Sequence, residues 1–317
     1  MDTLTGQSSW HTISRITQLH PLIAKIFESV NIPLTELSST SSRGGIVTHT
    51  PTSRKYFTKT QSDVDQMLGE ISGLRAMALT SPSIVPDVLG FEIFDNKRAA
   101  GMVTQYFELT SASRGHSIQK ELAQKLAEMH RPPPDGSEGY TGRYGFGVKT
   151  HCGVTEQDNT WEESWEVFFR DRRLGDMVRR IGDSQVSKTW EEMKQKAVPL
   201  LLHSFDPPPK PVILHGDLWS GNKGFDGATS SAVIYDPASY YGHNEADLGI
   251  THMFGGFSSE FYEEYHKIHP KSQPYYDERQ KLYELYHHLN HTLMFGGGYK
   301  SGALGIMRSL ISWAETV

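Results

Sequence analysis

Apolar residues follow two different patterns along the chain. Between residues 63 and 79 they recur on one face at helical spacing, which predicts an amphipathic helix. The segments 86–94 and 99–107 are instead short apolar runs bounded by turn residues, and KYFTK at 55–59 has the same character, so all three predict strands. The order strand, helix, strand, strand indicates a small sheet that carries one helix.

After Phe107 the pattern becomes mainly helical. This change places a domain boundary near residue 108, between an N-terminal lobe at 1–107 and a larger C-terminal lobe at 108–317. The predicted fold class is therefore α+β, with a small antiparallel sheet followed by a mostly helical lobe. Helical spacing is clearest in IQKELAQKLAEMH at 118–130, WEESWEVFFRDRRL at 161–174, residues 186–203 and three segments of the C-terminal tail.

Composition describes an ordinary globular protein. The chain has 317 residues, of which 37% are hydrophobic, and a formal net charge of -6. This charge provides no general attraction to nucleic acid or to anionic lipid, so neither is an expected partner. No stretch approaches the length of apolar sequence that a membrane helix needs, and a cytoplasmic location is expected. Cys152 is the only cysteine, which excludes an intramolecular disulfide and a zinc cluster built from thiolates, and we interpret it as a packing residue.

The strongest chemical signal is a pair of apolar strands that each end in a carboxylate. VILHGDLWSGN at 212–222 contains Asp217 followed five residues later by Asn222, and SAVIYDPA contributes Asp236 after a turn that suits a hairpin. Protein kinases use this spacing for phosphoryl transfer from ATP. We interpret Asp217 as the catalytic base, and Asn222 with Asp236 as oxygen ligands of Mg²⁺. A tight turn capped by an aspartate is the structural alternative.

Kinases also hold the ATP phosphates with a lysine that is paired to a glutamate on the neighbouring helix. Lys59, at the end of KYFTK, and Glu70, in the helix at 63–79, fit these roles, and Lys55 is the competing cation.

The segment GMVTQYF lies where such folds bind adenine through the backbone. Gln105, Tyr106 and Phe107 are the candidate adenine-side residues, although a plain connecting strand fits the same letters.

Together these motifs resemble those of the fructosamine-3-kinase and ketosamine-3-kinase family, also called protein-ribulosamine 3-kinases. The resemblance extends from FTK and MLGEISGL, through YGFGVKTHCG and NTWEESWEVFFRDRRL, to YELYHHLNHTLMFGGGY. HGDLWSGN followed by YDPASYYG is its most specific part. The resemblance implies a bilobal, protein-kinase-like fold. It also implies that ATP phosphorylates the 3-hydroxyl of a ketosamine sugar on lysine, free or on glycated protein, which leads to deglycation.

The resemblance also implies further site residues. Trp219 is expected at the mouth of the substrate pocket, where its indole stacks on the sugar or lysine stem or else packs in the core. Asn290 and His291 are expected beside the sugar pocket. Asp247 resembles the buried aspartate that supports the catalytic loop in this fold. The spacing of His287 and His291 could suggest a zinc pair, but the glutamate of a metalloprotease motif is missing.

The sequence departs from the family pattern in the loop that covers the nucleotide. Family members usually carry a glycine run that ends in cysteine, whereas this chain has only Gly44 and Gly45 and no cysteine there. We expect these two glycines to approach the phosphates, with weaker ATP binding and without redox control through a loop thiol.

Two rival functions are compatible with the motifs. A choline-kinase-like or aminoglycoside-kinase-like enzyme shares the three site residues, but its pocket should be lined with carboxylates, and the segment 277–295 offers His, Asn and Tyr instead. A pseudokinase that only binds glycated protein is supported by the glycine-poor loop. Catalysis is favoured because base, metal ligands and phosphate cation are all present.

Overall fold

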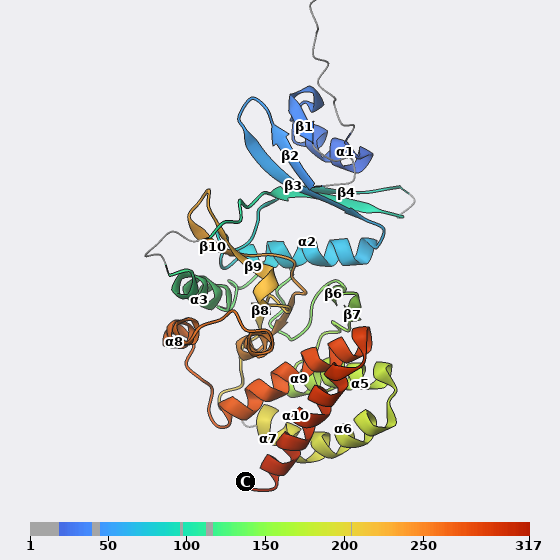
Figure 1. Cartoon of the computed structure of the whole chain (residues 1–317), viewed down its shortest axis with the longest axis vertical. Helices are drawn as coiled ribbons and strands as arrows, with labels where there is room; N and C mark the ends of the chain where they lie inside the picture. Colours follow the sequence, from blue (N-terminus) through green and yellow to red (C-terminus); the bar gives the residue numbers. More distant parts are fainter. Residues whose placement is uncertain (1–18, 40–44, 96–97, 112–116, 204) are drawn as a thin grey trace, which may run out of the picture.

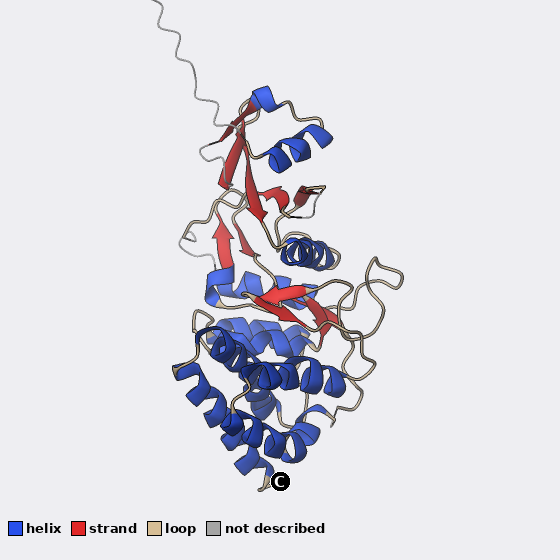
Figure 2. Cartoon of the chain, turned by 90° about the vertical axis from the view of Figure 1, so that its right-hand side faces the viewer, coloured by secondary structure: helices blue, strands red, loops and turns tan. Residues whose placement is uncertain are grey.

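The computed structural model describes residues 19–39, 45–95, 98–111, 117–203 and 205–317. A five-stranded sheet lies at one end of an elongated molecule and a group of helices lies at the other (Figure 1). Figure 2 shows the same order from the side, with the large sheet above and most helices below. The predicted combination of a small N-terminal antiparallel sheet and a mainly helical C-terminal part is confirmed.

The large sheet is antiparallel, with the strand order β1-β2-β3-β5-β4. Helix α2 begins where the side chain of Asp63 accepts a hydrogen bond from the backbone N–H of Gln66, which caps the helix at the predicted place. Its buried Met67 and Ile71 pack against β5 through Met102. The elements of this part are α1 (Pro21–Ser29), β1 (Leu37–Ser39), β2 (Gly45–His49), β3 (Arg54–Gln61), α2 (Val64–Ala78), β4 (Val88–Ile93) and β5 (Ala100–Gln105).

The helical part surrounds one continuous apolar core. Two helices differ from their predictions. The single helix expected at 186–203 is divided at Ala197 into α6 (Ser184–Lys196) and α7 (Val198–Leu202). The stretch expected from residue 161 begins at Trp165, where the Ser164 side chain accepts a hydrogen bond from the backbone N–H of Val167. It then widens into a π-helix over Phe168–Gly175. The helices here are α3 (Ile118–Met129), α4 (Trp165–Val167), α5 (Asp176–Ile181), α6 (Ser184–Lys196), α7 (Val198–Leu202), α8 (Ser259–Ile268), α9 (Tyr276–Phe295) and α10 (Gly298–Ala314).

Three short antiparallel pairs lie between the large sheet and the helices (Figure 1). The hairpin predicted between the two carboxylate motifs is present and pairs Lys223 with Ile234. The loop that contains Asp217 therefore joins the end of one pair to the start of another. The pairs are β6 (Thr150–Cys152) with β7 (Thr155–Gln157), β8 (Val212–Leu214) with β11 (Tyr240–Gly242), and β9 (Lys223–Asp226) with β10 (Ser231–Ile234).

No helix in the described part of the chain combines the length and the apolar character that crossing a bilayer requires.

Candidate active site

A buried carboxylate fixes the start of the loop after β8. Asp247 accepts hydrogen bonds from the backbone N–H groups of His215, at 2.8 Å, and Gly216, at 2.7 Å. Burial raises the pKa of this carboxyl, but the hydrogen bonds from His130 and Gly216 outweigh it and hold the pKa below its usual value. Asp247 is therefore ionised at neutral pH, and its predicted supporting contact with the loop is confirmed.

The same carboxylate is also hydrogen-bonded to His130, whose other ring nitrogen contacts Tyr265. His130 Nε2 lies 3.0 Å from Asp247 Oδ2, and His130 Nδ1 lies 2.7 Å from the hydroxyl of Tyr265. Asn244 donates a further hydrogen bond to this hydroxyl at 2.8 Å. We call His130, Asp247 and Tyr265 the anchor cluster. It fixes the loop rigidly because each of its polar side chains is buried and hydrogen-bonded.

His215 joins the two carboxylate motifs. The backbone N–H of Asp217 donates to His215 Nδ1 at 3.2 Å, so the ring hydrogen is on Nε2, which donates to the carbonyl of Tyr235 at 2.9 Å. Gly216 has φ of +80°, and a Cβ at this position would lie 2.1 Å from the carbonyl oxygen of Ala238. Only glycine lets the loop pass this closely beside the segment between Asp236 and β11.

The three residues of the predicted phosphoryl-transfer motif lie together. Asn222 Nδ2 donates to the backbone carbonyl of Asp217 at 2.9 Å and to its carboxylate at 3.3 Å. The same amide nitrogen is 3.4 Å from the carbonyl oxygen of Asp236. Since the nitrogen faces Asp217, the amide oxygen of Asn222 is directed elsewhere and is available to another partner.

The predicted lysine–glutamate pair is also present. Lys59 Nζ lies 2.7 Å from Glu70 Oε2 and 3.7 Å from Asp236 Oδ1. Burial lowers the pKa of Lys59, but the two carboxylates outweigh this and raise it, so the ammonium stays charged. The ammonium of the competing cation, Lys55, instead lies 5.6 Å from the ring centre of Tyr106. Of the two candidate lysines, Lys59 is therefore the one whose ammonium lies beside the Asp236 carboxylate.

A cavity of about 360 Å³ lies between the sheet, helix α2 and the two residues that follow β10. Its lining is mainly apolar, but it includes the carboxylates of Glu70 and Asp236, so one end adjoins the charged group just described. Gly45 is not among the residues that line it, and Gly44 lies outside the described residues. The lining consists of Phe57, Glu70, Leu74, Pro86, Met102, Thr104, Gln105, Tyr106, Phe107, Leu109, Tyr235 and Asp236, which include the three predicted adenine-side residues.

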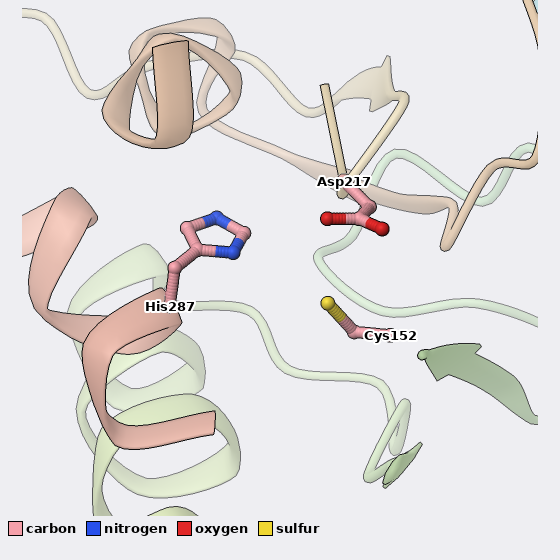
Figure 3. Close-up of side chains that lie close together, drawn as sticks. All are labelled: Cys152, Asp217 and His287. Carbon is pink, nitrogen blue, oxygen red and sulfur yellow. The ribbon is translucent and has the colours of Figure 1, made fainter. Parts of the chain in front are cut away.

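Asp217 has a second set of neighbours, which do not line the cavity. Figure 3 shows its carboxylate facing the thiol of Cys152, at the end of β6, and the ring of His287, on α9. One ligand-type atom from each of these residues lies within 4.8 Å of the other two. We call Cys152, Asp217 and His287 the base cluster.

Burial sets the charge states in the base cluster. It raises the pKa of Asp217 to about 6, although hydrogen bonds to Cys152 and Asn222 act in the opposite direction. It also raises the pKa of the Cys152 thiol well above its usual value and lowers that of His287 to about 3. At neutral pH Asp217 is therefore mostly ionised and poised to accept a proton, beside a neutral thiol and a neutral imidazole.

Of the residues predicted to bind the acceptor, Trp219 and His291 both lie against the ring of Phe254, whereas Asn290 is buried. Trp219 is 39% exposed and its indole meets Phe254 edge to face at 5.9 Å between ring centres, as a residue at the mouth of a site would. The ring of His291 is half-buried and stacks on Tyr299 at 4.9 Å. Asn290 is fully buried and donates to the carbonyl of Cys152 at 3.2 Å, so it lies beneath the base cluster and away from the surface.

The sequence prediction missed residues that only distant segments bring together. His130 follows α3 and carries no motif, and Cys152 was interpreted as simple packing although its thiol faces the Asp217 carboxylate. His287 was considered only with His291, whose Nδ1 instead lies 2.8 Å from the backbone oxygen of His287. The one available signal was the presence of Cys152 and His287 within the segments that carry the family resemblance, and it did not indicate that they meet.

The fold and the arrangement of these side chains define a phosphotransferase of the protein-kinase-like class. A model of the family described as "Fructosamine kinase" matches residues 23–313, so the chain belongs to the fructosamine kinase family. A chloroplastic protein-ribulosamine 3-kinase of Arabidopsis thaliana is 38% identical over 259 residues, which cover 80% of this chain and 74% of the relative. A mouse ketosamine-3-kinase is 40% identical over 203 residues, covering 62% of this chain and 64% of the relative.

Solved structures agree at the level of fold. A crystal structure described as a fructosamine-3-kinase of Thermobifida fusca superposes with a TM-score of 0.74 at 23% identity, covering 93% of this chain and 100% of that one. The predicted family and bilobal kinase-like fold are both confirmed.

Proposed function

We propose that this chain transfers the terminal phosphate of ATP to the 3-hydroxyl of a ketosamine, a ribulosamine or fructosamine adduct of lysine that is free or part of a glycated protein. The observation that carries this proposal is the convergence of Asp217, Asn222, Asp236 and Lys59 beside an apolar cavity, in a chain of the fructosamine kinase family. The names of the relatives support the acceptor class.

Asp217 is the proposed base. Its carboxylate accepts the proton of the attacking hydroxyl, and burial keeps its pKa close enough to neutrality for it to be ionised yet basic. The anchor cluster holds the loop in place, so the Asp217 carboxylate keeps a fixed orientation toward the hydroxyl of whichever acceptor is bound. Trp219 offers an exposed aromatic face two residues further along the loop, where it would pack on the sugar or on the lysine stem.

Lys59 and the cavity would hold the nucleotide. The ammonium of Lys59, oriented by Glu70, is the cation for the ATP phosphates, while Gln105, Tyr106 and Phe107 form the adenine side of the cavity. Gly44 and Gly45 remain the proposed phosphate-covering glycines.

The amide oxygen of Asn222 and the carboxylate of Asp236 fit Mg²⁺, because both are hard oxygen donors and the Asp236 side chain is 59% exposed. Magnesium bound there would neutralise charge on the transferring phosphate.

The proposal also includes the expected boundary between the two lobes and the expected location in the cell. The nucleotide lobe would end near residue 107, with the catalytic and acceptor-binding lobe beyond it, and the protein would act in the cytoplasm. The rival enzyme class, a choline-kinase-like or aminoglycoside-kinase-like phosphotransferase, predicts phosphorylation of cationic alcohols in place of ketosamines.

Turnover of defined acceptors tests the proposal. Purified protein with magnesium and ATP should release ADP when given ribulosamine-lysine, psicosamine-lysine or fructosamine-lysine, and phosphorus NMR should locate the new phosphate on the 3-oxygen. Asp217→Asn should lower kcat by about a thousandfold or more, because general-base catalysis is lost. Asp277→Asn, at an 81% exposed carboxylate, is the matched control and should leave kcat unchanged.

The outcomes separate the alternatives. Normal turnover by Asp217→Asn would remove the assigned base. Tight binding of a ketosamine without any ADP release by the wild-type protein would instead identify a binding module, and turnover of choline or an aminoglycoside alone would identify the rival enzyme class.

A further inference from the structure

The base cluster contains two polar side chains, Cys152 and His287, that a general base does not require. A thiol, a carboxylate and an imidazole approach from three separate parts of the chain, with their ligand-type atoms all within 4.8 Å of one another (Figure 3). Proton transfer from a sugar hydroxyl needs only the carboxylate of Asp217. The thiol of Cys152 and the ring of His287 therefore call for a separate physical explanation.

His287 supplies the clearest sign of a missing partner. The residue is only 4% exposed to solvent. Among the described residues, no hydrogen-bond partner reaches its Nδ1 atom. Figure 3 shows the ring directed from α9 toward Asp217 and Cys152. Leaving a buried polar atom unpaired costs about 1 to 3 kcal/mol, so such an atom beside other donor groups points to a ligand.

The three donor types together select a particular class of ligand. Thiolate, imidazole and carboxylate are the ligands of Zn²⁺ and of related thiophilic divalent cations, and three protein ligands with one open position is a common arrangement for zinc. Magnesium does not fit, because it prefers oxygen ligands. The base cluster also differs from the proposed magnesium pair, Asn222 and Asp236, which provides oxygen donors only.

We propose that Cys152, Asp217 and His287 form a binding site for Zn²⁺ or a similar thiophilic divalent cation, and that occupancy of this site inhibits the kinase. The bound cation would occupy the carboxylate of Asp217, which then could not accept the proton of the acceptor hydroxyl. Binding converts the Cys152 thiol to a thiolate and releases its proton to solvent. The inhibitory role rests on the proposed function, whereas the binding itself does not.

The geometry requires only small movements. Zinc bonds of about 2.0 to 2.3 Å at tetrahedral angles separate ligand atoms by about 3.5 Å, so side-chain tips now within 4.8 Å of one another must approach by about 1 Å. Rotation about the side-chain bonds of Asp217 and His287 can supply this shift. Burial and the charge of Asp217 hold the pKa of Cys152 well above its usual value, so the cation must displace the thiol proton, while a hydrogen bond from Asn290 and the positive charge of Arg173 act in the opposite direction. Asn290 thereby acts as an outer-shell partner of the site.

Cobalt binding tests the site without depending on turnover. Co²⁺ replaces Zn²⁺ in such sites, and cobalt–thiolate bonds absorb in the near ultraviolet. Because Cys152 is the only cysteine in the chain, this absorption can arise from no other residue. Titration of the untagged, metal-free protein in the presence of excess Mg²⁺ should produce the band with one cobalt per chain, and Zn²⁺ should remove it.

Three variants assign the ligands. Cys152→Ser should abolish the band, and His287→Asn should weaken cobalt binding by at least about tenfold, the loss typical of damage to a metal site. His288→Asn is the matched control, since His288 is adjacent on α9 but its Nε2 bonds Glu284 at 3.2 Å, and it should bind cobalt normally. Circular dichroism and thermal melting establish that each variant is folded.

Inhibition is measured separately, with each variant normalised to its own metal-free rate. Zn²⁺ should inhibit the wild-type protein in competition with the sugar acceptor, and Cys152→Ser should be at least about tenfold less sensitive. Absence of the cobalt band in folded wild-type protein, or a band unaffected by His287→Asn, would overturn the site. A normal cobalt band with equal zinc inhibition of wild type and Cys152→Ser would overturn the inhibitory role. If the protein has no kinase activity, the cobalt titration still decides whether the site exists.

Discussion

The anchor cluster and the base cluster lie on two sides of the same loop, yet they are built differently. In the anchor cluster, Asp247 accepts from two backbone N–H groups and from His130, whose other nitrogen meets Tyr265. In the base cluster, by contrast, His287 Nδ1 has no described partner and burial destabilises the charge on Asp217. The first arrangement holds the loop in place, whereas the second keeps polar groups available for ligands, at a cost in stability.

The largest effect is expected from the anchor cluster. Asp247→Asn should lower the free energy of unfolding by about 3 to 5 kcal/mol, because the amide cannot accept from both backbone N–H groups and His130 loses its charged partner. Urea unfolding measures this change, and Asp277→Asn on the surface should shift the free energy by no more than about 0.5 kcal/mol. Equal stability of the two variants would contradict the anchoring role.

A pair of histidine substitutions compares the clusters directly. His130→Leu should cost about 2 to 3 kcal/mol, because the buried Asp247 carboxylate and the buried Tyr265 hydroxyl each lose one hydrogen bond. His287→Leu replaces a ring whose Nδ1 is already unpaired, so its cost should stay below about 1 kcal/mol. Urea unfolding midpoints of the two variants provide the measurement, provided that the free energy of unfolding depends equally steeply on urea in both. A larger loss of stability in His287→Leu than in His130→Leu would contradict the distinction between the clusters.

Removing the charge of the base should stabilise the protein. The pKa of Asp217 is about 6 in the folded state and near 3.8 when unfolded, so the folded state holds the proton more tightly and ionisation costs stability as pH rises from about 4 to 6. Asp217→Asn should therefore gain about 3 kcal/mol at pH 7 and no more than about 0.5 kcal/mol at pH 4. Thermal melting at both values tests this, and a stabilisation that persists undiminished at pH 4 would rule out the explanation.

The same pKa sets the smallest expected effect, on the rate. If Asp217 must be ionised, kcat/KM should fall as pH drops below about 6, by about tenfold per unit, which corresponds to about 1.4 kcal/mol. Initial rates across pH 5 to about 8, with the stability of the enzyme checked at each value, measure this limb. A rate that is constant down to pH 5 would show that burial does not control this carboxylate.

Local sequence was sufficient wherever the chemistry depends on short spacing. The apolar runs predicted the sheet, α2 and the major helices, and HGDLWSGN with YDPA predicted which side chains meet around Asp217, because a strand, a loop and a hairpin leave few ways to place them. The start of the helix expected at residue 161 was misplaced, since a single capping hydrogen bond from Ser164 decides it.

The sequence by itself determined the family, the kinase-like fold and the candidate phosphoryl-transfer residues, since these depend on local periodicity and on motifs of fixed spacing. Only the tertiary structure decided that His130 supports Asp247 and that Cys152 and His287 face Asp217. These residues lie on segments far apart in the chain, and their meeting depends on how helices and strands pack. Burial likewise arises only on folding, and it is burial that raises the pKa of the base toward neutrality.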